Sequence, residues 1–247
     1  MISFLIAAAR SGIASQSRCA GAMATLVGTM LVGCLSSCST TAYPVTPELA
    51  QAHGLKAGQG YIVGTFNVKS MTDSGGKIEK SPDVKVFAQG TGKSRASSAI
   101  LMPTVSPGGG NPVWSGGATS REVIAIPVAA GNYEITLWNV SEGNLYFRNR
   151  LPMKVPFQVR PGEATYVGRV NSLNLYSASN GLLGGVQVLG AAAVLITDEF
   201  ATDSARIARS YPSIGRDKIR RSDVPRIYRA EMERISETPR KWLEWIR

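Results

Sequence analysis

Cysteine and histidine are the residues best suited to covalent, acid–base or metal chemistry, and this chain holds few of them. Its three cysteines, Cys19, Cys34 and Cys38, all precede residue 39, and His53 is its single histidine. A nucleophilic triad needs a base beside the nucleophile, and a zinc site needs three or four nitrogen, sulfur or carboxylate ligands. We therefore expect no disulfide framework and no thiol nucleophile beyond residue 38, no metal, no cofactor and no enzymatic activity.

Two glycine-containing segments and the acidic residues offer weaker signals. Gly90–Ser94 has the letters of the end of a phosphate-binding loop, but Phe87 stands where that motif needs a glycine, and a stretch rich in Pro and Gly follows instead of a helix. Gly58–Gly60 precedes an apolar run, whereas a dinucleotide fingerprint follows a strand. Both segments are predicted to be turns. The acidic residues between positions 60 and 197 are few and scattered, which disfavours the paired carboxylates of a glycosidase.

The composition excludes two broad classes of protein. Of the 247 residues, 44% are hydrophobic and 18% are charged, which excludes a disordered polyelectrolyte. Mean hydropathy is close to zero, which excludes a membrane protein with many spans. The formal net charge is +10, and residues 201–247 alone carry 12 basic residues, ten of them Arg, against 7 acidic ones. Much of the positive charge is therefore a local property of the C-terminal region.

This basic region and three tryptophans supply the candidate contact residues. Arginines near an anionic bilayer contribute about 1 kcal/mol each, and the same side chains suit a polyanionic surface polymer or a protein partner. The structural alternative is a solvated charged face on packed helices, with the tryptophans as core anchors or, for the one within 100–120, folded onto an edge of the β domain. The candidates for partner or membrane contact are Trp114, Arg220, Arg221, Arg226, Arg229, Trp242 and Trp245.

The first 33 residues have the pattern of an export signal. Arg10 and Arg18 precede an apolar stretch from Ala20 to Leu31, and no acidic residue occurs before Glu48. A basic region, an apolar region and a small-residue cleavage site, in that order, are typical of a secretory signal. The stretch is shorter than the about 20 residues that a transmembrane helix needs. An uncleaved or ordinary signal and a mitochondrial transit peptide are the alternatives. Because an exported protein rarely meets nucleic acid, we expect no nucleic-acid partner.

The end of this stretch, Leu31-Val32-Gly33-Cys34, resembles the lipobox of bacterial lipoproteins. Leu35–Cys38 is a second match, but we favour Cys34 because the apolar stretch runs directly into it and Gly33 is small. The resemblance implies cleavage before the cysteine, a diacylglycerol on its thiol and a fatty acyl group such as palmitate on its amino group. Two or three chains anchor a protein durably, whereas one is marginal. With no Asp after the cysteine, the resemblance implies an outer-membrane lipoprotein that faces the periplasm.

Three regions follow the signal peptide of residues 1–33. Residues 34–59 are rich in Ser, Thr, Pro and Gly and predict a flexible tether. Residues 60–197 contain about seven short runs of β-branched and aromatic residues separated by Gly, Pro and Asn, which predicts a mainly β domain, an antiparallel β-sandwich. In residues 198–247, apolar residues at helical spacing predict helices over 198–209 and 225–236, a C-terminal basic helical extension.

Two segments of the β region resemble a family of bacterial lipoproteins of unknown function with transthyretin-like or Ig-like sandwiches. Ile126–Ile135 is similar to their strand-turn-strand, with its Pro, Gly and Tyr, and Phe157–Gly168 is similar to their F-x-V-x-P-G-E-x-x-Y-x-G hairpin. Gly131 and Gly162 permit turns with positive φ. The resemblance implies a sandwich and a pairing of the runs on either side of Pro161-Gly162. It implies no catalytic residue.

These observations favour a lipid-anchored envelope protein that acts by binding or scaffolding. Its expected partners are the membrane, through the anchor, and an envelope protein or an anionic surface polymer. A subunit of a secretion or pilus-type assembly is the first alternative. A hydrolase of envelope polymers is the second, and the shortage of His and of clustered acids argues against it.

Overall fold

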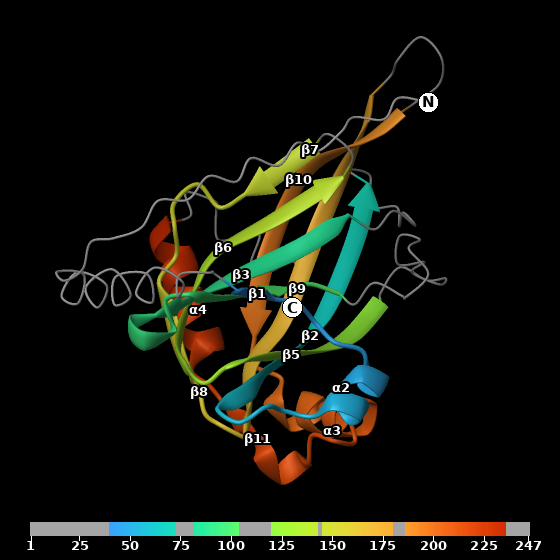
Figure 1. The fold of residues 1–247 in the computed structure, drawn as a ribbon. Coiled ribbons are helices and arrows are strands. Elements are labelled where there is room, and N and C mark those ends of the chain that lie inside the picture. Colours follow the sequence, from blue (N-terminus) through green and yellow to red (C-terminus); the bar gives the residue numbers. More distant parts are fainter. Residues whose placement is uncertain (1–39, 73–81, 104–119, 143–144, 180–185, 236–247) are drawn as a thin grey trace, which may run out of the picture. The chain divides into compact units, whose positions relative to one another are not determined.

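The computed structural model describes residues 40–72, 82–103, 120–142, 145–179 and 186–235, which form a mainly β structure with two sheets, and the mainly β prediction is thus confirmed (Figure 1). The first sheet has the strand order β1 (Thr40–Ala42), β4 (Ser97–Leu101), β3 (Asp83–Thr91), β6 (Gly131–Glu142), β7 (Leu145–Arg148), and β8 (Val155–Val159) also pairs with β6. The second has the order β10 (Val186–Thr197), β9 (Ala164–Ser179), β2 (Gln59–Thr72), β5 (Ser120–Ala129), and β11 (Ile219–Arg221) also pairs with β9.

Both sheets are mixed, so the prediction of purely antiparallel strands is wrong. β1 runs parallel to β4, and β9 runs parallel to both β2 and β11. The described residues also form eleven strands, more than the seven or so expected from the sequence. The parallel pairing of β9 with β2 follows from the connection before β9, which takes the chain from the first sheet into the second.

Two tight connections carry the chain from one sheet to the other. At these two places the sequence predicts a strand-turn-strand and a hairpin. β5 and β6 are joined through Ala130 alone, yet β5 pairs with β2 and β6 pairs with β3. β8 pairs with β6 and β9 pairs with β2, so the runs on either side of Pro161-Gly162 do not form the expected hairpin. Gly162 has a φ of 72°, which allows the chain to turn sharply into the second sheet. The Tyr133 hydroxyl donates to the Ala129 carbonyl at 2.8 Å and braces the first connection.

One hydrophobic cluster contains residues of both sheets. In β8, alternate residues are buried and the residues between them are exposed, which is the period-two pattern of a strand with one covered face. Phe66 of β2 and Ile135 of β6 are fully buried in this cluster although they come from different sheets. A second cluster lies on the other face of the second sheet, where Tyr61 and Val63 of β2 contact helical residues.

Residues 40–59 do not form the flexible tether that their composition predicts. They include β1 and the helix α2 (Pro47–His53), which the Thr46 side chain caps. Ala50 is buried in the second cluster, and the Tyr211 hydroxyl donates to the Val45 carbonyl at 2.8 Å. His53 ends α2 and is exposed. The segment is ordered by contacts with parts of the chain far away in sequence, which composition alone does not report.

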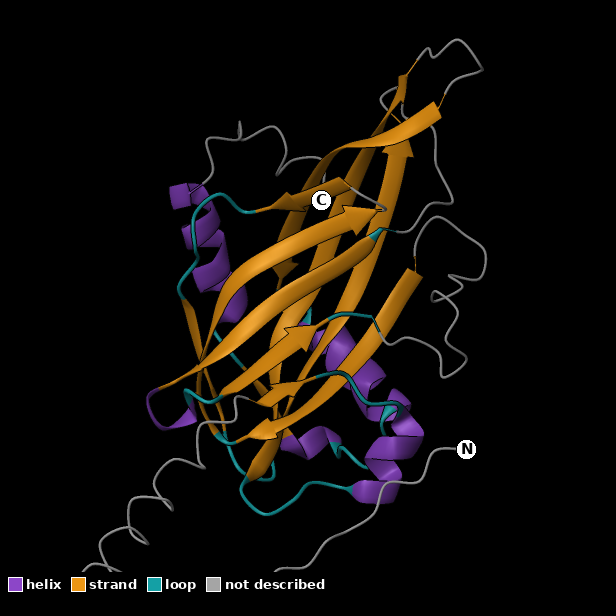
Figure 2. Ribbon diagram, turned by 45° about the horizontal axis from the view of Figure 1, so that its top comes forward, coloured by secondary structure: helices purple, strands orange, loops and turns teal. Residues whose placement is uncertain are grey.

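The two predicted C-terminal helices are present as α3 (Phe200–Ser210) and α4 (Val224–Ile235). They are parts of the packed structure rather than an extension of it. Val224 and Tyr228 of α4 are fully buried in the cluster shared by the sheets, where α4 packs against β8 and β10. Ile207 of α3 is fully buried in the second cluster together with Ala50 of α2, and the two helices, labelled in Figure 1, lie side by side at one end of the strands (Figures 1 and 2). Among the residues that the structure describes, no helix has the length and apolar character needed to cross a bilayer.

Burial of Tyr228 predicts a loss of stability in alkali. Burial raises the pKa of Tyr228 well above the ordinary value of 10.0. Above pH 10 the phenol ionises in the unfolded chain but not in the folded one, so folding binds a proton and stability falls as pH rises. We expect a loss of up to about 1.4 kcal/mol per pH unit from this group. In urea unfolding between pH 9 and 11, the loss of stability with rising pH should be shallower for Tyr228→Phe than for the wild type.

Candidate functional site

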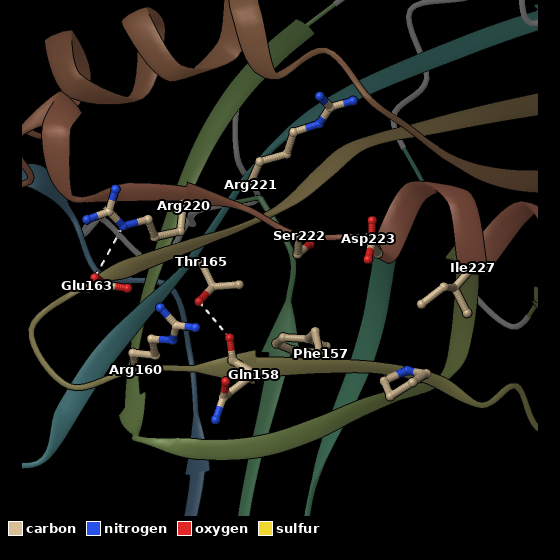
Figure 3. Close-up of a pocket in the computed structure, with 11 residues that line it drawn as sticks. Phe157, Gln158, Arg160, Glu163, Thr165, Arg220, Arg221, Ser222, Asp223 and Ile227 are labelled. Atoms are coloured by element: carbon tan, nitrogen blue, oxygen red, sulfur yellow. Dashed lines mark hydrogen bonds and ion pairs between the residues drawn. The ribbon is translucent and has the colours of Figure 1, made fainter.

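β11 and the start of α4 separate two hollows, each of about 660 Å³. The first, the Phe157 hollow, is lined by residues of β8, β9, β11 and α4, among them Phe157, Thr165 and Ile227 (Figure 3). The second, the Asn67 hollow, is lined by residues of β2, β9, β10 and α4, among them Asn67, Asn171 and Thr197. Arg221, Ser222 and Asp223 line both hollows. This segment is therefore the common wall of the two candidate binding sites.

The four arginines singled out from the sequence border these hollows. Arg220 lines the Phe157 hollow, Arg221 lines both, and Arg226 and Arg229 line the Asn67 hollow. Their side chains are 58%, 65%, 79% and 60% exposed, in the same order. The other sequence candidates lie outside the described residues: Leu31, Val32, Gly33, Cys34, Cys38, Trp114, Trp242 and Trp245.

Each of these arginines has a carboxylate neighbour. Arg220 contacts Glu163 at 3.2 Å, Arg221 contacts Asp198, Arg226 approaches Asp223 at 3.8 Å and Arg229 contacts Glu233 at 3.2 Å. Exposed ion pairs of this kind contribute about 0–1 kcal/mol, because water screens them and long side chains lose entropy. An anionic ligand can therefore replace such a carboxylate at little cost.

In the Phe157 hollow the polar groups are largely satisfied by one another. Thr165 Oγ1 donates to the Gln158 carbonyl at 2.9 Å, and Ser222 Oγ donates to the Tyr166 carbonyl at 2.6 Å. Figure 3 shows Arg220 reaching Glu163 at the rim. Among the described residues, no carboxylate lies within 4.0 Å of the Arg160 guanidinium. The hollow is thus a groove with a small apolar floor and one basic side chain without an acidic neighbour.

The floor of the Asn67 hollow is a chain of hydrogen-bonded amides. Asn67 Nδ2 donates to Asn171 Oδ1 at 2.9 Å, across the register pair that these residues form between β2 and β9. Asn171 Nδ2 donates to the Arg169 carbonyl at 3.2 Å and to Thr197 Oγ1 at 2.9 Å. Asn67 Oδ1 is buried and has no hydrogen-bond partner. One polar atom is therefore left unsatisfied in an otherwise closed network.

Behind the floor, the fully buried Asp203 joins α3 to the second sheet. Its carboxylate accepts hydrogen bonds from Thr65 Oγ1 at 2.6 Å, from the Tyr166 hydroxyl at 2.8 Å and from the Arg169 guanidinium. Burial, followed by the charge of Asp203, raises the pKa of Tyr166. Burial acts to lower the pKa of Arg169, but hydrogen bonding and attraction to Asp203 outweigh it and raise this pKa. The network fixes Arg169, which lines the hollow, from behind.

The turn predicted at Gly90–Ser94 is present over Gly92–Ser94, whereas Gly90 and Thr91 are the last residues of β3. The end of β3 passes into a single 3-10 turn, η1 (Gly92–Ser94), that leads to β4, and no phosphate-binding helix begins there. A Cβ on Gly90 would meet the Ser94 carbonyl oxygen at 1.9 Å, which explains the glycine by close packing of the turn. In the described ranges, no three residues among His, Cys, Asp and Glu gather where they could hold a metal ion.

The sequence reasoning missed Asn67, Lys69, Arg169 and Asp203. A signal for Asp203 was present, because it falls on the face of α3 that Phe200, Ile207 and Tyr211 make apolar. A carboxylate on an apolar helix face requires a buried partner. For Asn67 the signal was weaker: it is a polar residue at an alternate position of an apolar strand, and its partner on β9 depends on a crossover that local pattern does not reveal.

Comparisons with known proteins give no family for this chain. No family model matches it, and no curated protein does. Among solved structures, a leucine-rich repeat protein from Bacteroides thetaiotaomicron is 14% identical over 43% of this chain, with a TM-score of 0.23. The match spans 13% of that protein's chain. At this TM-score the likeness has no bearing on fold or function, so the functional argument depends on the residues themselves.

Proposed function

We propose that this protein is a lipid-anchored envelope protein that binds an anionic surface polymer through the basic residues around β11. The anchor is inferred from the leader and from the lipobox-like Leu31–Cys34, with Cys34 as the lipidated residue and Cys38 as the alternative. An outer-membrane location facing the periplasm follows from the same resemblance. The β domain would be a sandwich that carries the binding surface, and the protein would act without catalysis.

One observation supports binding most directly: Arg220, Arg221, Arg226 and Arg229 gather at the rims of two adjoining hollows. The carboxylates beside them are weak competitors, since exposed ion pairs contribute about 0–1 kcal/mol each. A polymer with repeated negative charges gains from several such sites at once. A flat protein partner would use the exposed arginines but has no evident use for the hollows. This difference favours a polymer over the subunit of an envelope assembly.

Retention on isolated cell envelopes tests both parts of the proposal. The wild-type chain should stay with the envelope at high salt and incorporate a palmitate analogue, because lipid chains hold it independently of charge. Cys34→Ala with Cys38→Ala should abolish labelling and leave a weaker association that salt removes, since salt screens charge–charge contacts. Adding Arg226→Glu with Arg229→Glu should abolish that residual association.

The matched control for these charge reversals is Arg148→Glu with Arg209→Glu, which leaves both hollows unchanged. Equal loss in the control would mean that only total charge matters, and the binding proposal would then be wrong. Labelling that persists in the double cysteine variant would contradict the anchor.

A further inference from the structure

The first residue of β1 lies close in sequence to both candidates for lipidation. Cys34 stands six positions before Thr40, and Cys38 stands two positions before it. A fully extended chain spans at most about 3.3–3.6 Å per residue, so these steps reach at most about 20 Å and about 7 Å. A cysteine whose acyl chains lie in the bilayer is held at the level of the headgroups. An anchor at either cysteine therefore keeps Thr40 near the membrane surface.

β1 is in turn fixed to the first sheet. The Thr40 amide donates to the Ala96 carbonyl at 2.8 Å, and the hydroxyls of Thr41 and Ser98 form a hydrogen bond of 2.9 Å. β1 also pairs along its length with β4. The end of the first sheet at which β1 begins, which we call the β1 end, is therefore the part of that sheet that the anchor holds closest.

The connections at the β1 end carry mostly positive charge. β4 and β6 begin at this end, and β3 and β8 end there. The charged residues in the segments that join these strands to the next elements are Lys93, Arg95, Arg160 and Glu163. Glu163 contacts Arg220 at 3.2 Å, so its charge is already paired. The basic residues that follow β3 thus lie beside the strand that leads from the anchor.

The turn after β3 holds two of these basic residues outward. Gly92 has a φ of 57°, which allows the chain to reverse, and the Arg95 amide donates to the Gly92 carbonyl at 3.3 Å. Gln89 Nε2 donates to the Arg95 carbonyl at 3.1 Å and braces the turn from β3. Ser94 is buried, whereas Lys93 and Arg95 on either side of it are exposed. The turn is therefore a fixed support that presents two cations to the solvent.

These two cations differ from the arginines around β11, each of which has a carboxylate neighbour. Among the described residues, no carboxylate lies within 4.0 Å of the charged group of Lys93 or Arg95. Each base close to an anionic bilayer is favourable, and the effect falls off within about 10 Å at moderate salt. Two bases are too few to hold a free protein at a membrane, so they act on a chain that the anchor already holds there.

We infer that Lys93 and Arg95 contact anionic phospholipid headgroups of the membrane that holds the anchor, so that the β1 end faces the bilayer. The inference rests on the lipid anchor of the proposed function. It goes beyond that function, which concerns the basic residues around β11 and a polymer. The membrane, rather than a dissolved polymer, is the polyanion that a short anchor places beside this turn.

Amine labelling of the lipidated protein tests the inference. The protein is purified from cell envelopes in mild detergent and inserted from outside into vesicles of phosphatidylcholine, with or without phosphatidylglycerol. Acetylation of each lysine is followed by mass spectrometry. We expect Lys93 to react about three- to fivefold more slowly on the anionic vesicles, the factor that one base near such a surface contributes, and high salt to remove the difference. Lys69, exposed toward the other end of β2, should react equally on both.

Arg95→Glu is the decisive variant, because Arg95 is exposed and forms no ion pair with a described residue. It should remove most of the protection of Lys93. The matched control, Arg148→Glu, changes an exposed residue of β7 that pairs with Asn139, far from the β1 end, and should leave the protection unchanged.

Equal reaction of Lys93 on both kinds of vesicle, or equal loss of protection in the control variant, would overturn the inference while the anchor stands. Protection of Lys93 by dissolved polygalacturonate in detergent, without protection by anionic vesicles, would assign the turn to the polymer and also overturn it. If the protein carries no lipid and does not insert into the vesicles, the anchor of the proposed function fails, and the inference fails with it.

Discussion

Asp203→Ala is expected to lower the free energy of unfolding by about 3–5 kcal/mol, the range for removing one partner of a buried ion pair. The variant leaves the Arg169 guanidinium, only 12% exposed, with the long 4.0 Å contact to the Glu199 carboxylate in place of its close ion pair with Asp203. It also removes the acceptor of the Thr65 and Tyr166 hydroxyls, which are buried with it. A domain of this size has about 5–15 kcal/mol of stability in total, so the loss would be a large fraction of it. Urea unfolding followed by circular dichroism measures it.

Two further variants separate the charge from the packing. Asp83→Ala removes an exposed acid from β3 and should change stability by no more than about 0.5 kcal/mol. Arg169→Met combined with Asp203→Leu removes both charges. The loss of unfolding free energy in this double variant should be smaller than the sum of the losses in the two single variants, because the double variant leaves no buried charge unpaired. Additive losses, or a loss below about 1 kcal/mol for Asp203→Ala, would mean that the network does not hold α3 on the sheet.

The elements of this fold were predictable where local pattern decides them. The alternation in Val155–Val159 and the apolar run of Val186–Thr197 mark strands, and both are strands in the structure. The helical spacing around Ile207 and around Tyr228 likewise marks α3 and α4. In each case the side chains report which face is covered, since a strand repeats every two residues and a helix every 3.6 or so.

Pairing was not predictable in the same way, because it depends on where a turn directs the chain. Pro161-Gly162 looks the same in sequence whether the next strand returns beside β8 or crosses to the other sheet. In the structure the Tyr61 amide donates to the Glu163 carbonyl at 2.9 Å, and Gly162 donates to the Gln59 carbonyl at 2.8 Å. These contacts with β2 draw the turn to the second sheet. They join positions about a hundred residues apart, which no local pattern reports.

The candidate site was predictable only in part, because some of its features are local in sequence and others depend on strand pairing. The arginines were visible as a local excess of charge, and they do lie at the rims of the hollows. The amide pair of Asn67 and Asn171, which lines one of the hollows, exists only because β2 and β9 lie side by side. Charge composition thus indicated where a ligand could be attracted, whereas the chemistry of that ligand depends on tertiary contacts.

Tyr228→Ala is expected to cost about 3–5 kcal/mol, the range for truncating a large buried side chain. Tyr228 is fully buried in the cluster that contains both sheets, and its hydroxyl donates to the Val194 carbonyl at 2.9 Å. The cavity would therefore open between α4 and the strands, and urea should unfold helix and strands in one transition at lower concentration. Tyr228→Phe keeps the ring and should lose only about 0.5–1.5 kcal/mol, the value of one hydrogen bond.

The comparison with Arg226→Ala on the same helix decides what α4 is. Arg226 is 79% exposed, and its removal should change stability by no more than about 0.5 kcal/mol. A basic helix that is only an appendage could lose the Tyr228 side chain without effect on the strands. The strand signal in circular dichroism would then disappear at the same urea concentration as in the wild type. A helix that packs against β8 and β10 cannot lose this side chain without effect on them, because the apolar area that the substitution exposes includes surface of those strands. If Tyr228→Ala loses the strand signal at a lower urea concentration and Arg226→Ala does not, α4 is a helix of the core. The positive charge of this region then lies on the outer face of that helix, and the packing beneath holds this face in place for binding.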